Sequence, residues 1–128
     1  TIINRLPHKY ILKAQEISDV YVSLNRFGNL SNANLEAMKF GQCMIFPKSQ
    51  KETSVDLVLD RLVLENSALR IKSSDDIDGL ANGILYLYNN PTKRIQFSKN
   101  MKISAEKFIP NWDNRISQEL KIINGLLS

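Results

Sequence analysis

Apolar residues along the chain alternate between short continuous runs and longer helical periods. Residues 19–24 (Asp-Val-Tyr-Val-Ser-Leu) predict a strand, because β-branched and aromatic side chains fill its middle. Residues 43–46 (Cys-Met-Ile-Phe) form a fully apolar run that predicts a buried strand, ended by Pro47. Residues 68–71 predict another strand, and residues 1–3 (Thr-Ile-Ile) are a further candidate. These runs predict a sheet of short strands.

Helical periods occupy the segments between these strands. Residues 31–40 predict a short helix that stops at Gly41, where a left-handed residue is favoured. A second helix is expected to begin near Ser54. Two strands joined by one short helix need a crossover connection, so neighbouring strands are expected to be parallel. The alternation is typical of an α/β fold, and a chain of 128 residues is expected to form a single domain, residues 1–128.

The tail after Asp75 is predicted to be entirely helical. The segment 73–76 (Ser-Ser-Asp-Asp) has the composition of a helix cap, Asn90 precedes a proline at a first helical position, and Asn111 is expected to cap a last helix. The spacing in the first of these helices predicts a single apolar face toward the core. That predicted core face consists of Ile77, Leu80, Ala81, Ile84 and Tyr88.

Charge and ligand chemistry narrow the classes of function. The net charge is +4, but Lys and Arg are scattered, which disfavours nucleic-acid binding and fits a slight attraction for phosphates or acidic lipids. His8 and Cys43 are the only residues of their types, so no metal site is expected. Asp75, Asp76 and Asp78 are expected to stabilise a helix start. A single cysteine excludes an internal disulfide and fits a reducing compartment such as the cytoplasm.

The segment 20–40 is the most informative one chemically, because it predicts a strand, a polar loop and a helix start in that order. Open parallel sheets bind ligands beyond the carboxyl ends of their strands. A helix start adds unpaired backbone N–H groups and a partial positive charge, a combination suited to phosphate. Glu36, one turn into the helix, is placed to accept hydrogen bonds from ribose hydroxyls. An ordinary capped helix gives the same pattern, so both interpretations stay open.

The same segment resembles the donor-site core of the group 1 family of glycosyltransferases, which have the two-domain GT-B fold. The resemblance rests on residues 17–24 and on residues 29–45, which contain Leu-Glu-Ala-Met, a glycine and an apolar strand. It continues through residues 75–91, which resemble the family's penultimate helix, and residues 108–113, which resemble its aromatic turn. It implies a Rossmann-like parallel sheet with flanking helices and a helical tail, as in a truncated C-terminal GT-B domain.

The resemblance also assigns roles to individual residues. Glu36 matches the second Glu of the family's Glu-x7-Glu motif, which holds the nucleotide ribose. The backbone N–H groups of Leu30, Ser31 and Asn32 fall where the family binds the donor sugar and diphosphate. Gly28 stands where the first Glu, which contacts the donor sugar, is expected. A neighbouring amide, Asn29 or Asn25, is the candidate to replace that contact, and no residue is assigned a catalytic role.

The family's domain begins one or two βα units earlier, so the resemblance implies that this chain is a fragment of a longer parent. The preceding units carry a basic pair that meets the donor phosphates, and a separate N-terminal domain binds the acceptor. The implied activity is retaining transfer of a hexosyl group from a nucleotide sugar to a polysaccharide or glycolipid, without a metal or other cofactor. The expected location is cytoplasmic, with the parent peripheral to the inner face of the membrane.

Two further expectations follow from the sequence. Removal of preceding strands would leave apolar surface uncovered, so the chain is expected to self-associate. The alternative function is a non-catalytic α/β interaction module, or a degenerate glycosyltransferase half, with Gly28 as the sign of lost activity. The discriminating feature is whether the helix start at Ser31 and the carboxylate of Glu36 are open to a ligand or covered by protein.

Overall fold

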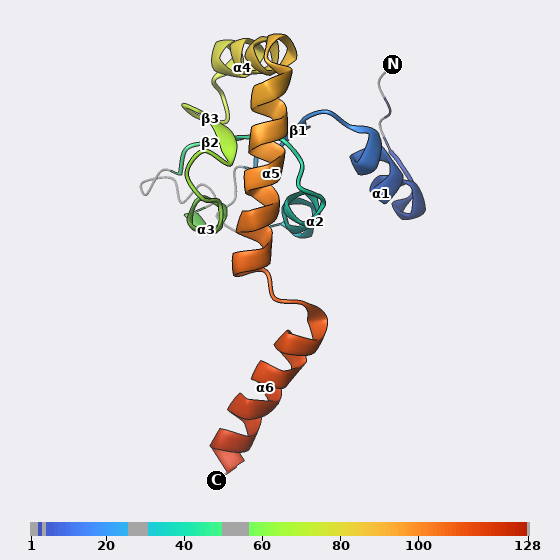
Figure 1. The fold of residues 1–128 in the computed structure, drawn as a ribbon, viewed down its shortest axis with the longest axis vertical. Coiled ribbons are helices and arrows are strands. Elements are labelled where there is room, and N and C mark those ends of the chain that lie inside the picture. The colour runs from blue at the N-terminus through green and yellow to red at the C-terminus, as the bar shows by residue number, and fades with distance from the viewer. Residues whose placement is uncertain (1–2, 4, 26–30, 50–56, 128) are drawn as a thin grey trace.

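A computed structural model describes residue 3 and residues 5–25, 31–49 and 57–127. Within these ranges the chain is an α/β structure, with a parallel three-stranded sheet and flanking helices (Figure 1). In chain order the elements are α1 (His8–Ile17), β1 (Tyr21–Val22), α2 (Asn32–Phe40), β2 (Met44–Pro47), α3 (Leu57–Leu62), β3 (Ala68–Ile71), α4 (Ile77–Asn89), α5 (Pro91–Phe108) and α6 (Trp112–Leu127).

The strands lie side by side in the order β1-β2-β3, and both pairs are parallel, as the short crossovers predicted. β1 is shorter than the predicted strand 19–24, although the N–H groups of Tyr21 and Ser23 both donate to carbonyls of β2 and its flank. β2 includes Pro47, which the sequence placed just beyond the strand. Of the candidate strand 1–3, only Ile3 is described, and it lies outside the sheet with an exposed side chain.

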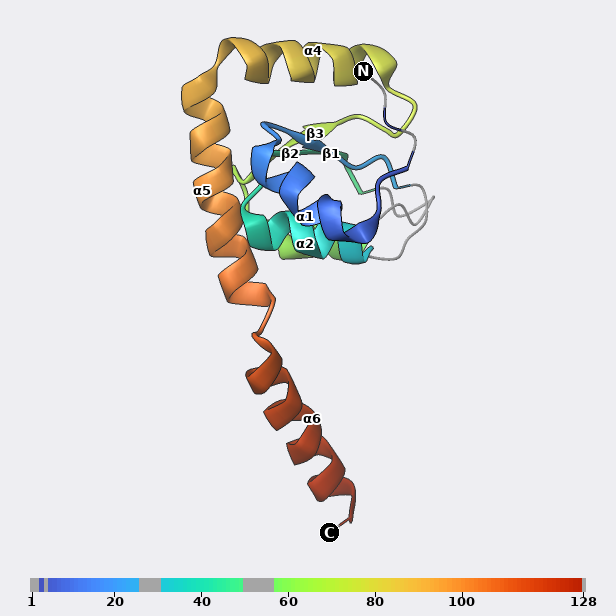
Figure 2. The same ribbon diagram turned by 90° about the vertical axis from the view of Figure 1, so that its right-hand side faces the viewer.

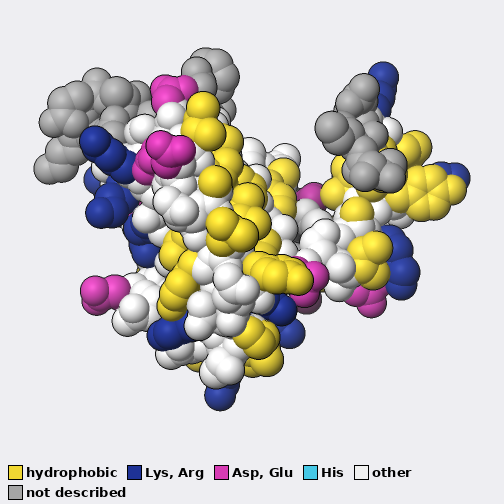
Figure 3. Space-filling view, turned by 90° about the horizontal axis from the view of Figure 1, so that it is seen from above, with side chains coloured by type: hydrophobic (Ala, Val, Ile, Leu, Met, Phe, Trp, Pro, Cys, Tyr) yellow, Lys and Arg dark blue, Asp and Glu magenta, His cyan; other side chains and the backbone are white. Residues whose placement is uncertain are grey.

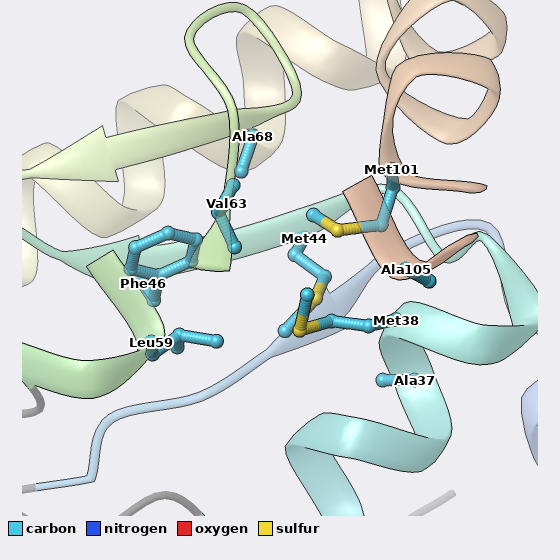
Figure 4. Close-up of a cluster of buried hydrophobic side chains, with 9 residues drawn as sticks. All are labelled: Ala37, Met38, Met44, Phe46, Leu59, Val63, Ala68, Met101 and Ala105. Carbon is cyan, nitrogen blue, oxygen red and sulfur yellow. The ribbon is translucent and has the colours of Figure 1, made fainter. Parts of the chain in front are cut away.

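Two clusters of buried side chains cover the two faces of the sheet. One packs α2, α3 and the lower part of α5 against β2 through nine residues (Figure 4): Ala37, Met38, Met44, Phe46, Leu59, Val63, Ala68, Met101 and Ala105. The other packs the sheet against α4 and the start of α5 through Cys43, Ile45, Ile71, Leu87 and Phe97. Figure 2 shows the resulting layers, with α4 above the sheet, α2 below it and α5 along one end, and Figure 1 shows α1 to one side, beyond β1.

The caps of α2 confirm its predicted bounds. The Ser31 hydroxyl accepts a hydrogen bond from the Asn34 N–H at 3.2 Å, and Gly41 ends the helix with a left-handed φ of 67°. The aliphatic stem of Lys102 on α5 crosses directly over Gly41. The glycine therefore serves twice, since it supplies the left-handed turn and leaves room for α5.

The predicted core face of α4 is right for Leu80, which is partly buried and packs against the cluster on this side of the sheet, and wrong for the other four residues, Ile77, Ala81, Ile84 and Tyr88, which are exposed. The sheet instead receives Gly83 and Leu87, both buried, whereas Ile77 and Tyr88 are 79% and 76% exposed. A Cβ atom at Gly83 would lie 2.5 Å from a methyl group of Leu69, so the missing side chain is what allows α4 to approach the strands. The side chains of Ile77, Ile84 and Tyr88 are consequently exposed and not packed against the sheet.

The helical tail is confirmed. Asp76 caps α4 by accepting from the Gly79 N–H at 2.9 Å, and Asn111 caps α6 by accepting from the Asn114 N–H at 2.9 Å. Asn90 precedes Pro91 as expected, but its side-chain amide donates to the Tyr86 carbonyl at the end of α4 instead of capping α5. α6 projects away from the body of the molecule (Figure 1).

Cys43 is buried between the sheet and α5, as a small hydrophobic residue would be. Burial raises the pKa of its thiol to about 11, although the nearby Arg94 lowers it slightly. A thiol in this state is protonated at neutral pH and chemically inert. Among the residues that the structure describes, none of the helices has the combined length and apolar character that a membrane crossing requires.

Candidate functional site

The carboxyl ends of the three parallel strands meet at one edge of the sheet. β1 leads from this edge toward α2, β2 is followed there by Lys48 and Ser49, and β3 is followed by Lys72. The first residues of α2 and α4 lie at this same end of the molecule (Figure 2). This is the edge at which open parallel sheets bind their ligands.

A small polar network fixes the start of α2 against β1. The Tyr21 hydroxyl donates a hydrogen bond to the Asn34 side-chain oxygen at 3.1 Å, and Asn34 is completely buried. The Asn34 N–H in turn donates to the Ser31 hydroxyl. Because a buried polar group needs its partners, this network sets both the position of the helix start and the rotation of α2 about its axis.

The start of α2 is accessible. Ser31 is half-buried and occupies the N–H groups of Asn34 and Leu35, whereas Asn32 and Ala33 are exposed. The backbone N–H groups of Asn32 and Ala33 have no acceptor within the described part of the chain. Unpaired N–H groups at a helix start are the donors that bind phosphate oxygens.

The starts of α2 and α4 differ in charge. α2 has no acidic residue in its first turn, whereas α4 is capped by Asp76 and carries Asp78 in its first turn. Two carboxylates offset the positive end of the α4 dipole and repel a second anion. Of these two helix starts at the carboxyl edge, that of α2 is therefore the one suited to an anionic ligand.

Glu36 is half-buried and lies one turn inside α2. Burial raises the pKa of the Tyr21 hydroxyl, and the negative charge of Glu36 raises it further. The structure thus brings together Ser31, Asn32 and Glu36 on one helix start, beside Tyr21 of the first strand. Gly28, Asn29 and Leu30, the other predicted donor-site residues, lie outside the described residues.

A second polar group at this edge was missed by the sequence interpretation. Asp60 of α3 accepts hydrogen bonds from Ser49 at 2.7 Å and from Arg70 at 2.8 Å, and the Arg70 guanidinium lies 5.1 Å from the ring centre of Phe46. These residues line an open hollow of about 440 Å³ together with Lys48 and Glu65. No local pattern could reveal the pair, because its members come from different elements.

The ion pair between Asp60 and Arg70 is expected to make the folded state sensitive to acid. Partial burial raises the pKa of Asp60, but the hydrogen bonds from Ser49 and Arg70 and the charge of Arg70 outweigh it and hold the pKa below its ordinary 3.8. Its stabilising contribution is therefore fully present above about pH 4 and is lost as the pH falls through the lower, folded-state pKa.

Urea unfolding between pH 7 and pH 3 measures this contribution. We expect Asp60→Asn to lower the free energy of unfolding by about 1 kcal/mol at pH 7, because the pair is partly exposed, and by less at pH 3. Asp19→Asn, at an exposed carboxylate 4.0 Å from Arg94, is the matched control and should change little. An equal loss at both pH values for Asp60→Asn would contradict the assignment.

Within the described ranges, no group of three or more His, Cys, Asp and Glu side chains is placed to hold a metal ion. The side chain of His8 lies outside what the structure describes. Comparisons with protein families, with curated proteins and with solved structures find no match for this chain.

Proposed function

We propose that this chain is the donor-binding half of a two-domain glycosyltransferase and that its α2 start binds the diphosphate of a nucleotide sugar. The observation that carries the proposal is the open, acid-free helix start at the carboxyl edge of a parallel sheet, with a carboxylate one turn inside. The resemblance of residues 17–45 to the group 1 glycosyltransferases supports the same ligand. The donor of this family transfers a hexosyl group to a polysaccharide or glycolipid acceptor.

The roles proposed for the individual residues follow from their charges and their positions on α2. The exposed N–H groups of Asn32 and Ala33 would hold diphosphate oxygens, and thereby stabilise the negative charge that develops on the leaving group. Glu36 would accept hydrogen bonds from the ribose hydroxyls, which fixes the nucleotide relative to the helix. With Gly28 in place of the family's first Glu, the contact to the transferred sugar falls to a residue without a charge. Transfer itself requires the acceptor domain of the parent.

Isothermal titration with UDP, GDP and inorganic pyrophosphate tests the role of Glu36. We expect Glu36→Ala to weaken the better-bound nucleotide about tenfold, because a hydrogen bond to a charged group contributes about 1.5–3 kcal/mol. Pyrophosphate has no ribose, so its affinity should be unchanged or slightly higher once the negative charge is removed.

Glu106→Ala is the control, since Glu106 is an exposed helical glutamate on α5 that lines the same hollow as Lys39 at the other end of α2. It should leave both affinities unchanged. If Glu36→Ala lowers the affinities for nucleotide and for pyrophosphate equally, Glu36 does not bind the ribose. Unchanged nucleotide affinity in that variant would refute the ribose role as well.

The second candidate function, a non-catalytic interaction module, is favoured by one specific observation. Four of the apolar α4 residues that the sequence assigned to the core are exposed on the surface: Ile77, Ala81, Ile84 and Tyr88. This surface lies on the helix above the sheet, away from the start of α2 (Figure 2), so donor binding and association are separable.

A further inference from the structure

Lys48 is a cation at the carboxyl end of the central strand. β2 lies between β1 and β3, and the Lys48 N–H continues the parallel ladder beyond the strand by donating to the Ile71 carbonyl at 2.8 Å. Its side chain is exposed, and its ammonium forms no ion pair or hydrogen bond within the described part of the chain. This charge can therefore reach a ligand at the carboxyl edge.

The alternation of side chains along β2 places Lys48 on the α2 side of the sheet. Met44 and Phe46 pack into the cluster formed with α2, α3 and α5, and side chains two residues apart on a strand share a face. Lys48 is the next member of this series, and it lines a hollow with Asp60 of α3, which agrees with that direction. The opposite face is covered by α4, over which Figure 3 shows a band of hydrophobic side chains.

The other charges in this hollow leave Lys48 free to contact an anion. The hollow has a volume of about 440 Å³, and its second cation, Arg70, donates to Asp60 at 2.8 Å and to the Val63 carbonyl at 3.0 Å. Glu65, the remaining charged residue of the hollow, is exposed and forms no ion pair within the described ranges. A ligand that binds Lys48 therefore breaks no ion pair seen in the structure.

The start of α2 alone cannot neutralise a diphosphate. Its N–H groups and its dipole amount to about half a positive charge, whereas a diphosphate carries more than one negative charge. α2 follows β1, and β1 is the neighbour of β2, with paired strands about 4.8 Å apart. The flexible side chain of Lys48 thus projects beside the helix start, on the same side of the sheet.

We propose that Lys48 binds the second phosphate of the ligand and makes the site selective for diphosphates over monophosphates. This inference rests on the proposed function, because the N–H groups of Asn32 and Ala33 hold the first phosphate. The Lys48 ammonium donates to oxygens of the second phosphate and offsets its charge. A monophosphate occupies the start of α2 alone and gains less from Lys48.

Titration with inorganic pyrophosphate and with inorganic phosphate, followed by NMR at the amides of Asn32 and Ala33, tests this selectivity. We expect Lys48→Gln to weaken pyrophosphate about tenfold and phosphate no more than about twofold, because a hydrogen bond to a charged group is lost only with the longer ligand. Lys48→Arg keeps the charge and should retain most of the pyrophosphate affinity. Because the ratio of the two affinities is measured on one protein, a partial loss of folded chain does not change it.

Lys39→Gln is the control, since Lys39 is an exposed lysine in the last turn of α2, at the end away from Asn32. It should leave the ratio unchanged. If Lys48→Gln leaves the ratio unchanged, or if Lys39→Gln lowers it equally, the role of Lys48 is wrong although the α2 site remains. If pyrophosphate does not shift the two amides in the unaltered chain, the α2 site and the role of Lys48 are both overturned.

Discussion

Replacing Phe46 with alanine is expected to lower the free energy of unfolding by about 3–5 kcal/mol, the largest stability effect of any substitution considered for this chain. Phe46 lies in the central strand and is 1% exposed, in contact with the buried cluster formed by α2, α3 and α5 (Figure 4). The ring also supports the Arg70 guanidinium, which holds Asp60 at the carboxyl edge. Loss of the ring thus leaves a cavity and weakens the polar edge together.

Urea unfolding followed by circular dichroism measures this loss. Phe40→Ala provides the control, because Phe40 ends α2 with a side chain that is 40% exposed and belongs to neither buried cluster, so its loss should cost less, about 1–2 kcal/mol. If the two substitutions cost the same, β2 is not the centre of the core and the layer arrangement described above is wrong.

Replacing Gly41 with valine is expected to cost about 2 kcal/mol or more. The residue adopts a left-handed φ of 67°, which a β-branched side chain tolerates poorly, and an added Cβ would lie 2.3 Å from the Cγ atom of Lys102. The substitution should therefore loosen the contact between α2 and α5 as well as strain the turn. Thermal unfolding gives the size of the effect.

Gly125→Ala is the control, because its expected effect on stability has the opposite sign. Gly125 lies within α6 with nothing within 4 Å of the position of an added Cβ, so Gly125→Ala should be neutral or stabilising by up to about 1 kcal/mol. A double variant separates the steric clash with Lys102 from the backbone strain at Gly41. Adding Lys102→Ala to Gly41→Ala should restore the part of the stability that the clash removes, but not the part that the left-handed backbone removes. Full restoration of stability would show that the left-handed turn contributes nothing.

The sequence predicts the elements that depend on local signals. The strand at residues 68–71, the Ser31 cap, the Gly41 stop and the Asn111 cap are each encoded within a few neighbouring residues, and the structure confirms all four. The parallel arrangement of the strands follows from the short helical crossovers and is also confirmed.

The face of α4 could not be predicted, because the decisive residue is a glycine. Helical spacing identified a genuine apolar stripe, but the sheet packs against Gly83, where absence of a side chain permits close approach to Leu69. Likewise, the contact between Asp60 and Arg70 joins a helix to a strand and leaves no mark in either segment alone. Tertiary contacts of this kind depend on the shapes of surfaces from distant parts of the chain, and the spacing of residues within one segment does not encode them.

The donor site stays a prediction. The structure places Ser31, Asn32 and Glu36 on the helix start at the carboxyl edge of the sheet, with Asn32 and Ala33 exposed. As the sequence predicted, the start of α4 carries Asp76 and Asp78; the structure adds that this acidic start lies at the same edge of the sheet as the start of α2. This contrast gives a specific expectation: the same anion should bind at the start of α2 and not at the start of α4.

The most direct test is therefore an NMR titration of the isotopically labelled chain with UDP and with inorganic pyrophosphate, resolving each backbone amide. The account predicts that both ligands shift the amides of Asn32 and Ala33 and leave those of Ile77 and Gly79 at the start of α4 unchanged. Shifts concentrated at the start of α4, or none at either helix at millimolar ligand, would contradict the assignment of α2 as the diphosphate site.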